Sequence, residues 1–341
     1  MAFHASRIFI LLLVASLSAM FFVLYQSKLS RDISWTTFSR KFNLALEDRS
    51  FETKATTCRA PSYDSSVTSM PPAELETPMP VLLKAKFSKL PVWDFEDIYN
   101  QDAPPRQSTC RQSLRNSPDE SFRKAFLPNM RLFLHKNNIN MSEWNRLSHF
   151  NNPFGFMGFT YGDVMSSVKL IPRPKEPLLL PKPGGDGCIR CAVVGTAGIL
   201  NGSKMGKEID AHDYVFRPRT YYARQFNESR FYVLHQDFLR YVRNSFLKSP
   251  HLNARYWAIV RPTNGAFTIF LALHTCDTVD AYGFMTQDYA KYSNYYFERG
   301  GKSRVVFYAN HDYVLEMKTW KKLHDSKIMR LYQRTEQEAV G

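Results

Sequence analysis

The chain contains 341 residues and carries a formal net charge of +14, from 45 lysines and arginines against 31 aspartates and glutamates. This length accommodates one large folded domain plus accessory segments. The positive charge suits an anionic ligand. The basic residues are scattered along the chain and do not form the runs that mark a nucleic-acid-binding protein, so we expect no nucleic-acid partner.

The first recognisable element is an apolar run, IFILLLVASLSAMFFVLY, at residues 8–25. Its 18 residues are near the lower limit for a helix that crosses a bilayer. The small residues that a signal peptidase requires lie inside the run and not after it, which favours an uncleaved signal-anchor. We therefore expect a cytosolic tail at 1–7, a transmembrane segment at 8–25 and a luminal remainder, as in a single-pass type II membrane protein.

The segment from residue 26 to residue 106 loses apolar periodicity, and prolines recur in it among serine, threonine and glutamate. A chain of this composition buries too little apolar surface to fold. We expect an extended luminal stem over 26–106, with local structure around 92–95. A folded domain is expected over 107–337.

The folded region shows helical and strand patterns in alternation. Ser121–Leu134 has apolar residues near helical spacing, although Pro128 interrupts it, and Phe238–Leu247 places its apolar residues on one helical face. Short apolar runs predict strands. This alternation predicts an α/β fold. The four predicted strands are 192–194, 257–260, 279–282 and 305–308.

A glycine-punctuated loop follows the first of these strands. Gly195, Gly198, Gly202 and Gly206 come directly after the apolar run at 192–194. Glycines at such a position allow backbone N–H groups to approach a phosphate closely, although an ordinary turn has the same pattern. A dinucleotide-binding oxidoreductase is disfavoured, because the loop lacks the G-x-G-x-x-G spacing.

A second candidate anion site begins at the turn Pro262-Thr263-Asn264-Gly265, which opens an apolar helix. This turn places Thr263, Asn264 and Gly265 at the helix N-terminus, where free N–H groups and the helix dipole favour anions. A plain N-cap is the alternative interpretation.

The five cysteines are Cys58, Cys110, Cys188, Cys191 and Cys276. Cys188 and Cys191 form a C-x-x-C pair, but no second C-x-x-C or H-x-x-x-H follows in the sequence. This disfavours a zinc site and favours structural disulfides to distant partners.

Four segments resemble, in order, the sialyl motifs of the animal sialyltransferases, glycosyltransferase family 29. The large motif corresponds to Cys188–Arg217, the small motif to Pro262–Phe284 and the third motif to Tyr295–Glu298. His311–Glu316 matches the family's His-x4-Glu pattern. The resemblance extends over Cys110–Arg334 and is strongest to the branch that sialylates O6 of protein-linked N-acetylgalactosamine.

This resemblance implies a modified Rossmann-like (GT-A-like) three-layer α/β/α domain with a mostly parallel sheet. It also implies transfer of sialic acid from CMP-sialic acid to O-glycosylated proteins at the Golgi membrane, with inversion of configuration. The expected reaction uses no metal and no further cofactor. Imidazole suits the role of general base near neutral pH, and the resemblance assigns that role to His311.

The resemblance assigns further roles by position in the motifs. It pairs Cys191 with Cys276 and Cys110 with Cys188, and it leaves Cys58 able to link two chains. Glu316 and His274 are expected to support the site. The expected donor-binding residues are Gly195, Thr196, Thr263, Asn264, Gly265 and Tyr295. Three sequons, at Asn140, Asn201 and Asn227, are candidate glycosylation sites.

The sequence departs from the family pattern at several positions. Thr196 replaces an asparagine that contacts the donor, Tyr295 replaces a histidine of the third motif, and Asn264 replaces a threonine. Arg217 runs directly into Pro218, where the family has an asparagine-containing stretch and several dozen further residues. At least one strand–helix unit is therefore expected to be missing. The alternative to an active enzyme is a non-catalytic sialyltransferase-like variant with an impaired donor site.

Overall fold

The computed structural model describes residues 77–104, 106–217, 231–298 and 303–334. The predicted cytosolic tail, the transmembrane segment, Cys58 and Asn227 lie outside these residues. No helix in the described ranges is long and apolar enough to cross a membrane.

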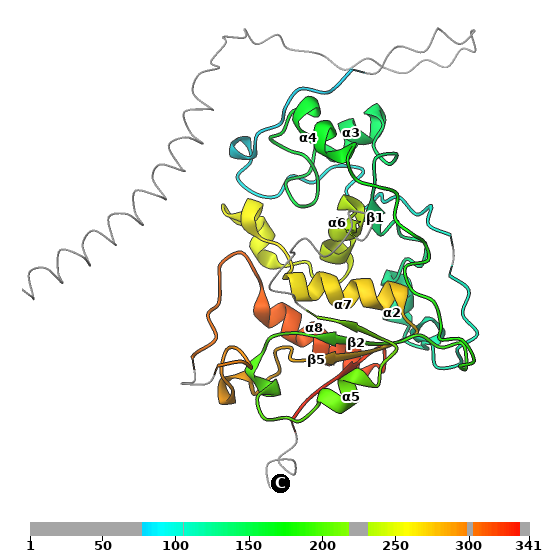
Figure 1. The fold of residues 1–341 in the computed structure, drawn as a ribbon. Coiled ribbons are helices and arrows are strands. Elements are labelled where there is room, and N and C mark those ends of the chain that lie inside the picture. Colours follow the sequence, from blue (N-terminus) through cyan, green and yellow to red (C-terminus); the bar gives the residue numbers. More distant parts are fainter. Residues whose placement is uncertain (1–76, 105, 218–230, 299–302, 335–341) are drawn as a thin grey trace, which may run out of the picture. The chain divides into compact units, whose positions relative to one another are not determined.

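A parallel sheet forms the centre of the described fold (Figure 1). Its strands are β2 (Arg190–Val194), β3 (Tyr214–Phe216), β5 (Thr278–Tyr282) and β6 (Arg330–Leu331), in the order β3-β2-β5-β6. All three pairings are parallel. The strands predicted at 192–194 and 279–282 are confirmed as parts of β2 and β5.

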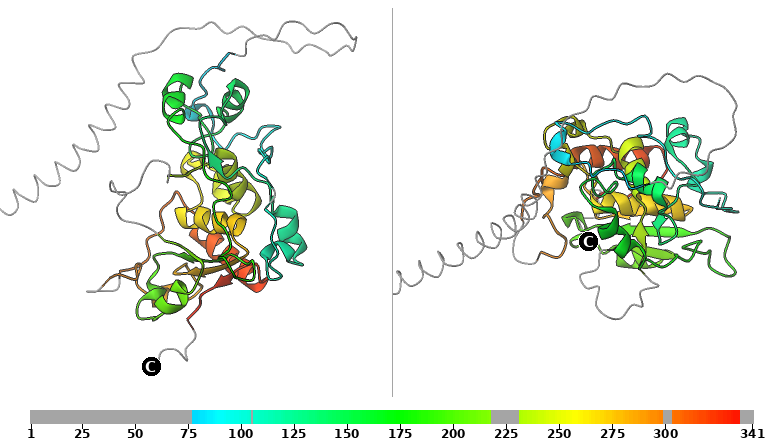
Figure 2. Two further views of the ribbon diagram at one scale, coloured as in Figure 1. Left: turned by 45° about the vertical axis from the view of Figure 1, so that its right-hand side comes forward. Right: turned by 90° about the horizontal axis from the view of Figure 1, so that it is seen from above.

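The sheet is covered on both faces, because side chains along a strand alternate in direction. Cys191 and Val193 of β2 join a large apolar cluster that includes residues of α7 (Asn264–Thr275) and α8 (Tyr313–Asp325). Ala192, between them, joins a smaller cluster on the other face. In Figures 1 and 2, α5 (Gly206–Asp210) lies across the sheet from α7. The described fold is therefore a three-layer α/β/α arrangement.

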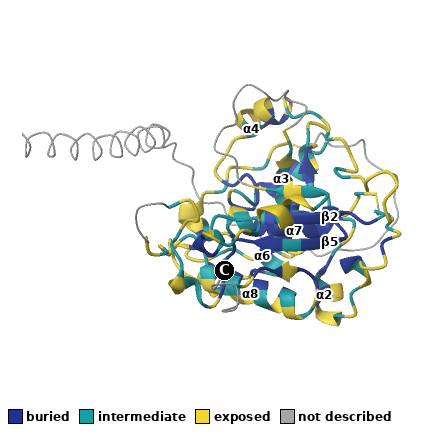
Figure 3. Ribbon diagram, turned by 60° about the horizontal axis from the view of Figure 1, so that its bottom comes forward, coloured by how far each residue is buried: buried dark blue, intermediate teal, exposed yellow. Residues whose placement is uncertain are grey.

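Burial is highest at the centre of these layers, where β2, β5 and α7 are largely buried (Figure 3). The remaining elements surround this centre. The helices are α2 (Glu120–Ala125), α3 (Met141–Leu147), α4 (Tyr161–Val168) and α6 (Gln236–Ser245), and β1 (Phe133–Leu134) pairs with β4 (Val233–Leu234). Short 3₁₀ helices occur at Lys84–Lys86, Leu114–Asn116, Gly198–Leu200, Pro250–Asn253, Trp257–Ile259 and Tyr289–Lys291.

Three of the predicted elements need correction. Of the helix predicted over Ser121–Leu134, only α2 forms, because the helix ends before Pro128. The last two residues of the predicted range form β1. The strand predicted at 257–260 is a 3₁₀ helix, and 305–308 forms no strand and is mostly exposed. The helix predicted over Phe238–Leu247 is confirmed as α6.

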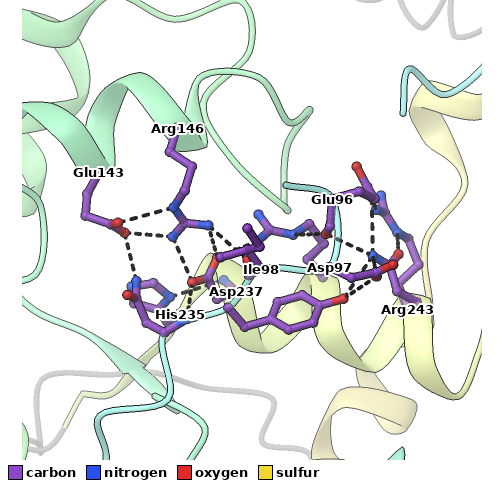
Figure 4. A network of polar contacts seen from close by, with 12 residues as sticks. Glu96, Asp97, Ile98, Glu143, Arg146, His235, Asp237 and Arg243 are labelled. Atoms are coloured by element: carbon purple, nitrogen blue, oxygen red, sulfur yellow. Dashed lines mark hydrogen bonds and ion pairs between the residues drawn. The ribbon is translucent and has the colours of Figure 1, made fainter. Parts of the chain in front are cut away.

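The predicted stem is also too long, because the segment at 84–104 packs against the folded domain. Trp93 donates its indole N–H to the carbonyl oxygen of His149, and Leu90 donates its backbone N–H to Leu252. Glu96 pairs at 2.5 Å with Arg243 of α6, whose side chain is 1% exposed (Figure 4). Composition does not reveal these contacts, because they join residues more than 50 positions apart in the sequence.

A polar network links this N-terminal segment to α6 and α3 (Figure 4). Arg146 of α3 pairs with Asp237 of α6 at 2.8 Å, and Arg240 donates hydrogen bonds to the carbonyl oxygens of Glu96 and Ile98. Burial lowers the pKa of Arg243 to about 10 and raises the pKa of Glu96 above its usual value. These charges are buried, so each depends on its partners for stability.

Candidate active site

A pocket of about 940 Å³ opens at the carboxyl ends of β2 and β5. In the sheet, β3 pairs with one side of β2, and β5 pairs with the other side. The direction in which strands are added therefore reverses at β2, and ligands bind at such a switch point in open α/β sheets. Residues of the glycine loop, the α7 N-terminus and the His-x4-Glu segment line this pocket. The fold thus brings together three motifs that are far apart in the sequence.

The glycine loop begins the pocket wall. Gly195 donates its backbone N–H to the carbonyl oxygen of Tyr282 at 2.7 Å, and a Cβ at Gly195 would collide with the carbonyl oxygen of Gly283. Only glycine therefore allows the backbones that follow β2 and β5 to approach this closely without displacement. Thr196, the next residue, also lines the pocket.

The N-terminus of α7 forms a second wall, at Thr263, Asn264 and Gly265. Thr263 is the N-cap, and its hydroxyl accepts a 3.1 Å hydrogen bond from the backbone N–H of Ala266. The first N–H groups of a helix have no partner within the helix. Together with the helix dipole they favour an anionic ligand group here.

Glu316 of α8 lies behind this N-terminus. Its Oε1 atom accepts a hydrogen bond from the backbone N–H of Thr263, and its Oε2 atom accepts one from the Thr263 hydroxyl, both at 2.7 Å. The residue is 7% exposed, and burial raises the pKa of its carboxyl group to about 7. Glu316 thus holds Thr263 in place and can change charge near neutral pH.

His311 lies in the loop before α8 and lines the same pocket. Its Nδ1–H donates a 2.8 Å hydrogen bond to the carbonyl oxygen of Arg261, while the side-chain amide of Asn310 lies 3.2 Å from its Nε2. With Nδ1 protonated in the neutral ring, Nε2 carries the lone pair. Partial burial lowers the pKa of His311 below its usual 6.5. The neutral imidazole can therefore act as a base at neutral pH.

Two of the predicted site residues do not line the pocket, although Tyr295 forms a β-bridge with Ala197, which does. Tyr295 is 38% exposed, and its ring stacks on Phe297 outside the set of side chains that line the pocket. His274 is buried in the core, where its ring stacks on Phe126 at 4.5 Å and Nδ1 hydrogen-bonds to Phe270. Burial lowers its pKa to about 4. His274 is thus a neutral packing residue that supports α7 from inside.

Both disulfides implied by the resemblance are present. Cys191–Cys276 joins β2 to the C-terminal end of α7, and Cys110–Cys188 joins the segment before α2 to the entry of β2. The first of these links connects the two elements that carry the glycine loop and the helical anion site. Its position allows it to keep the two walls of the pocket in register.

Sequence reasoning missed several pocket residues. Arg217, Tyr313 and Trp320 line the pocket, and Arg261 orients His311. Arg217 and Tyr313 lie inside motifs that the sequence already identified, so their positions were the available signal. Arg261 orients His311 through its backbone carbonyl group, and a pattern of side chains in the sequence cannot predict such a contact.

Two of the three predicted glycosylation sites are described, and both are exposed. Asn140 caps α3 by accepting a hydrogen bond from the backbone of Glu143, and Asn201 lies in the loop after β2. Their occupancy stays a prediction. Within the part of the chain that the structure describes, no group of three histidine, cysteine, aspartate or glutamate residues is arranged to hold a metal ion.

Comparison with known proteins identifies relatives for most of this chain. A family model described as glycosyltransferase family 29 (sialyltransferase) matches residues 133–226 and 218–328. The chain is 35% identical to alpha-N-acetylgalactosaminide alpha-2,6-sialyltransferase 1 of Gallus gallus, covering 84% of this chain and 68% of the relative. It is also 35% identical to the Homo sapiens protein of that name, covering 77% of this chain and 59% of the relative.

A solved structure described as a mammalian sialyltransferase is 19% identical to this chain, with a TM-score of 0.46. It covers 67% of this chain and 100% of its own.

The alignment to the Gallus gallus protein also contains positions that no residue of this chain fills. The alignment to the Gallus gallus protein runs over 387 positions, whereas 84% of 341 residues is about 286, so about 100 positions have no counterpart here. The two segments matched by the family model meet at 218–226, next to the Arg217–Pro218 junction. Among the described strands, β3 lies at the edge of the sheet beside this junction.

Proposed function

This chain belongs to glycosyltransferase family 29, the sialyltransferases, and from this premise we propose that it transfers sialic acid from CMP-sialic acid to O6 of N-acetylgalactosamine on O-glycosylated proteins. The observation that carries the proposal is the pocket shared by the glycine loop, the α7 N-terminus and His311. The choice of acceptor and linkage is supported by the names of the relatives from Gallus gallus and Homo sapiens.

In the proposed reaction the acceptor hydroxyl attacks the anomeric carbon of the sialic acid. The Nε2 atom of His311 takes the hydroxyl proton as the new C–O bond forms, and its Nδ1–H stays bound to the carbonyl oxygen of Arg261. The bond between the anomeric carbon and the phosphate oxygen breaks, and CMP leaves with the electron pair. Attack opposite the leaving group inverts the anomeric centre.

The leaving phosphate is the group that the α7 N-terminus would stabilise. CMP carries a single phosphate, so backbone N–H groups and the Thr263 hydroxyl can stabilise its charge without a metal ion. Asn264 and Gly265 supply the first N–H groups of the helix. Gly195 and Thr196 line the opposite wall, where the loop backbone can contact the nucleotide.

The cellular setting is part of the same proposal. The apolar segment 8–25 and the sequons support a type II Golgi membrane protein with a luminal catalytic domain. Protease protection of the C-terminal domain in sealed vesicles, together with sensitivity to an N-glycan-removing enzyme, would test this topology. Non-reducing electrophoresis with and without Cys58→Ser tests a disulfide-linked dimer.

A transfer assay tests the activity itself. The full chain is incubated with CMP-sialic acid and desialylated mucin, and the linkage of the product is determined by linkage-selective sialidases. We expect sialic acid on O6 of N-acetylgalactosamine. A folded preparation that binds CMP but transfers no sialic acid would reject the activity. A preparation that sialylates only galactose would reject the acceptor.

A further inference from the structure

The Thr263 hydroxyl donates its single proton to the Glu316 carboxylate. Transfer of sialic acid does not by itself require this contact. We propose that Glu316 takes up a proton when the anionic donor binds, and that this proton frees the Thr263 hydroxyl to donate a hydrogen bond to the donor phosphate. This inference rests on the proposed function, because that function supplies the identity of the donor.

The argument begins with the single proton of the Thr263 hydroxyl. A threonine hydroxyl has one proton to donate and two lone pairs that accept. One lone pair of Thr263 Oγ1 accepts from the backbone N–H of Ala266 at 3.1 Å. The proton points at Oε2 of Glu316, 2.7 Å away. While Glu316 is ionised, the Thr263 hydroxyl therefore has no proton to offer a ligand in the pocket.

Protonation of Glu316 reverses this hydrogen bond without moving any heavy atom. The added proton sits on Oε2 and is donated to the second lone pair of Thr263 Oγ1. Oε1, which accepts from the backbone N–H of Thr263 at 2.7 Å, remains an acceptor. The hydroxyl keeps its bond from Ala266, and its own proton turns into the pocket that Thr263 lines. One proton from solvent is the only atom added.

Both forms of Glu316 are accessible near neutral pH. Glu316 is 7% exposed, burial raises its pKa to about 7, and the neighbouring Asp312, the N-cap of α8, acts in the same direction. A phosphate at the α7 N-terminus adds a second negative charge close to the carboxylate, so donor binding favours the neutral form. Donor binding and proton uptake are thus coupled.

The other charged groups around Glu316 do not replace this proton. Arg243 of α6 and Arg261 share a small cavity with Glu316 and Asp312. Arg243 pairs with Glu96, and Asp312 accepts hydrogen bonds from Ser249 and from the backbone of Leu315. His311 and Tyr313 lie on the pocket side. In the described residues, no salt bridge involves Glu316, so only the two hydrogen bonds from Thr263 stabilise its ionised form.

Calorimetry of donor binding measures this proton directly. CMP-sialic acid is titrated into the full chain, without acceptor, at about pH 7.5 in buffers that differ in ionisation enthalpy. The phosphodiester of the donor does not titrate in this range, so any proton taken up goes to the protein. We expect net uptake of a fraction of one proton per donor. We also expect the affinity to fall by up to about tenfold per pH unit above pH 7.

Variants assign the proton to Glu316. Glu316→Gln keeps both hydrogen bonds to Thr263 in the arrangement of the neutral acid, so proton uptake should vanish and affinity should not depend on pH. Thr263→Val should bind the donor about 10-fold more weakly and lose most of the pH dependence, whereas Thr263→Ser should retain both. His311→Gln should still take up the proton, which separates Glu316 from the imidazole.

The outcomes separate this inference from the proposed function. Donor binding without proton uptake, or equal uptake by the wild-type and Glu316→Gln chains, overturns the inference and leaves sialyl transfer standing. A folded chain that does not bind CMP-sialic acid overturns both. If Glu316→Gln does not fold, the wild-type measurement and the Thr263 pair still decide the question.

Discussion

The Nδ1–H group of His311 donates a hydrogen bond of 2.8 Å to the carbonyl oxygen of Arg261. The backbone N–H of Arg261 in turn donates to the carbonyl oxygen of Asn310, at 2.9 Å. The loop that carries the imidazole is therefore attached to the segment before α7 by two bonds that need no particular side chain at Arg261. This attachment selects the ring form in which Nε2 is the base.

This geometry predicts the pH dependence of turnover. The neutral form of His311 is the active base, and its pKa lies below 6.5. At saturating donor and acceptor we expect kcat to be constant at neutral pH and to fall about tenfold per pH unit below that pKa. Steady-state kinetics across the acid range measures this decline. A kcat that rises on acidification would contradict the assignment.

Glu316→Gln should change how stability depends on pH. The folded pKa of Glu316 is raised from 4.5 to about 7, so its contribution is fully present below pH 4.5 and is lost as the pH rises to about 7. At each pH, the unfolding free energy of the variant is compared with that of the wild type. This difference should favour the variant by up to about 3 kcal/mol more at pH 8 than at pH 4. Urea denaturation at the two pH values measures the difference. An equal effect at both pH values would show that Glu316 does not titrate in this range.

Removing the N-terminal segment should destabilise the domain. A fragment that starts at Gln107 lacks Glu96 and leaves the buried charge of Arg243 without its partner. We expect a loss of about 3–5 kcal/mol compared with a fragment that starts at Ala73. The midpoint of urea unfolding measures this loss.

Point variants provide the matched control for that segment. Glu96→Gln removes the same charge and should lower stability, whereas Asp94→Asn changes an exposed residue and should be neutral. Equal stability of the two fragments would mean that the contacts in Figure 4 contribute little.

Gly195→Ala should disturb the donor wall of the pocket. Its Cβ would collide with the carbonyl oxygen of Gly283, so the ends of β2 and β5 must separate, at a cost of about 1–3 kcal/mol. Weaker CMP binding should accompany the lower stability. Gly206→Ala, where a Cβ meets no atom within 4 Å, is the control and should bind CMP normally. Identical CMP affinity in both variants would contradict the assignment of Gly195 to the donor-binding site.

The sequence predicts the centre of this fold well because burial and backbone geometry leave clear patterns there. β2 contains a short apolar run, β5 alternates polar and apolar residues, and the turn before α7 has the composition of a helix start. The run at 257–260 has the same apolar character but forms a 3₁₀ helix, with Trp257 in the core. Local patterns alone do not distinguish these two outcomes.

The packed N-terminal segment and the proton-linked contact could not be predicted in the same way. Glu96 stands in a proline-rich stretch, and only the three-dimensional arrangement places it against Arg243. The resemblance identified Glu316 as a supporting residue. Its role follows from its burial and from two hydrogen bonds to Thr263, 53 positions away.

The most direct test of the central claim compares the transfer of sialic acid by the full chain with that by His311→Gln. Both proteins are first shown to bind CMP equally. We expect the wild-type chain to place sialic acid on O6 of N-acetylgalactosamine. The variant should be slower by about 10²–10⁴-fold, which is the usual contribution of a general base. Equal rates would contradict the role of His311, and no transfer by a wild-type chain that binds CMP would contradict the proposed activity.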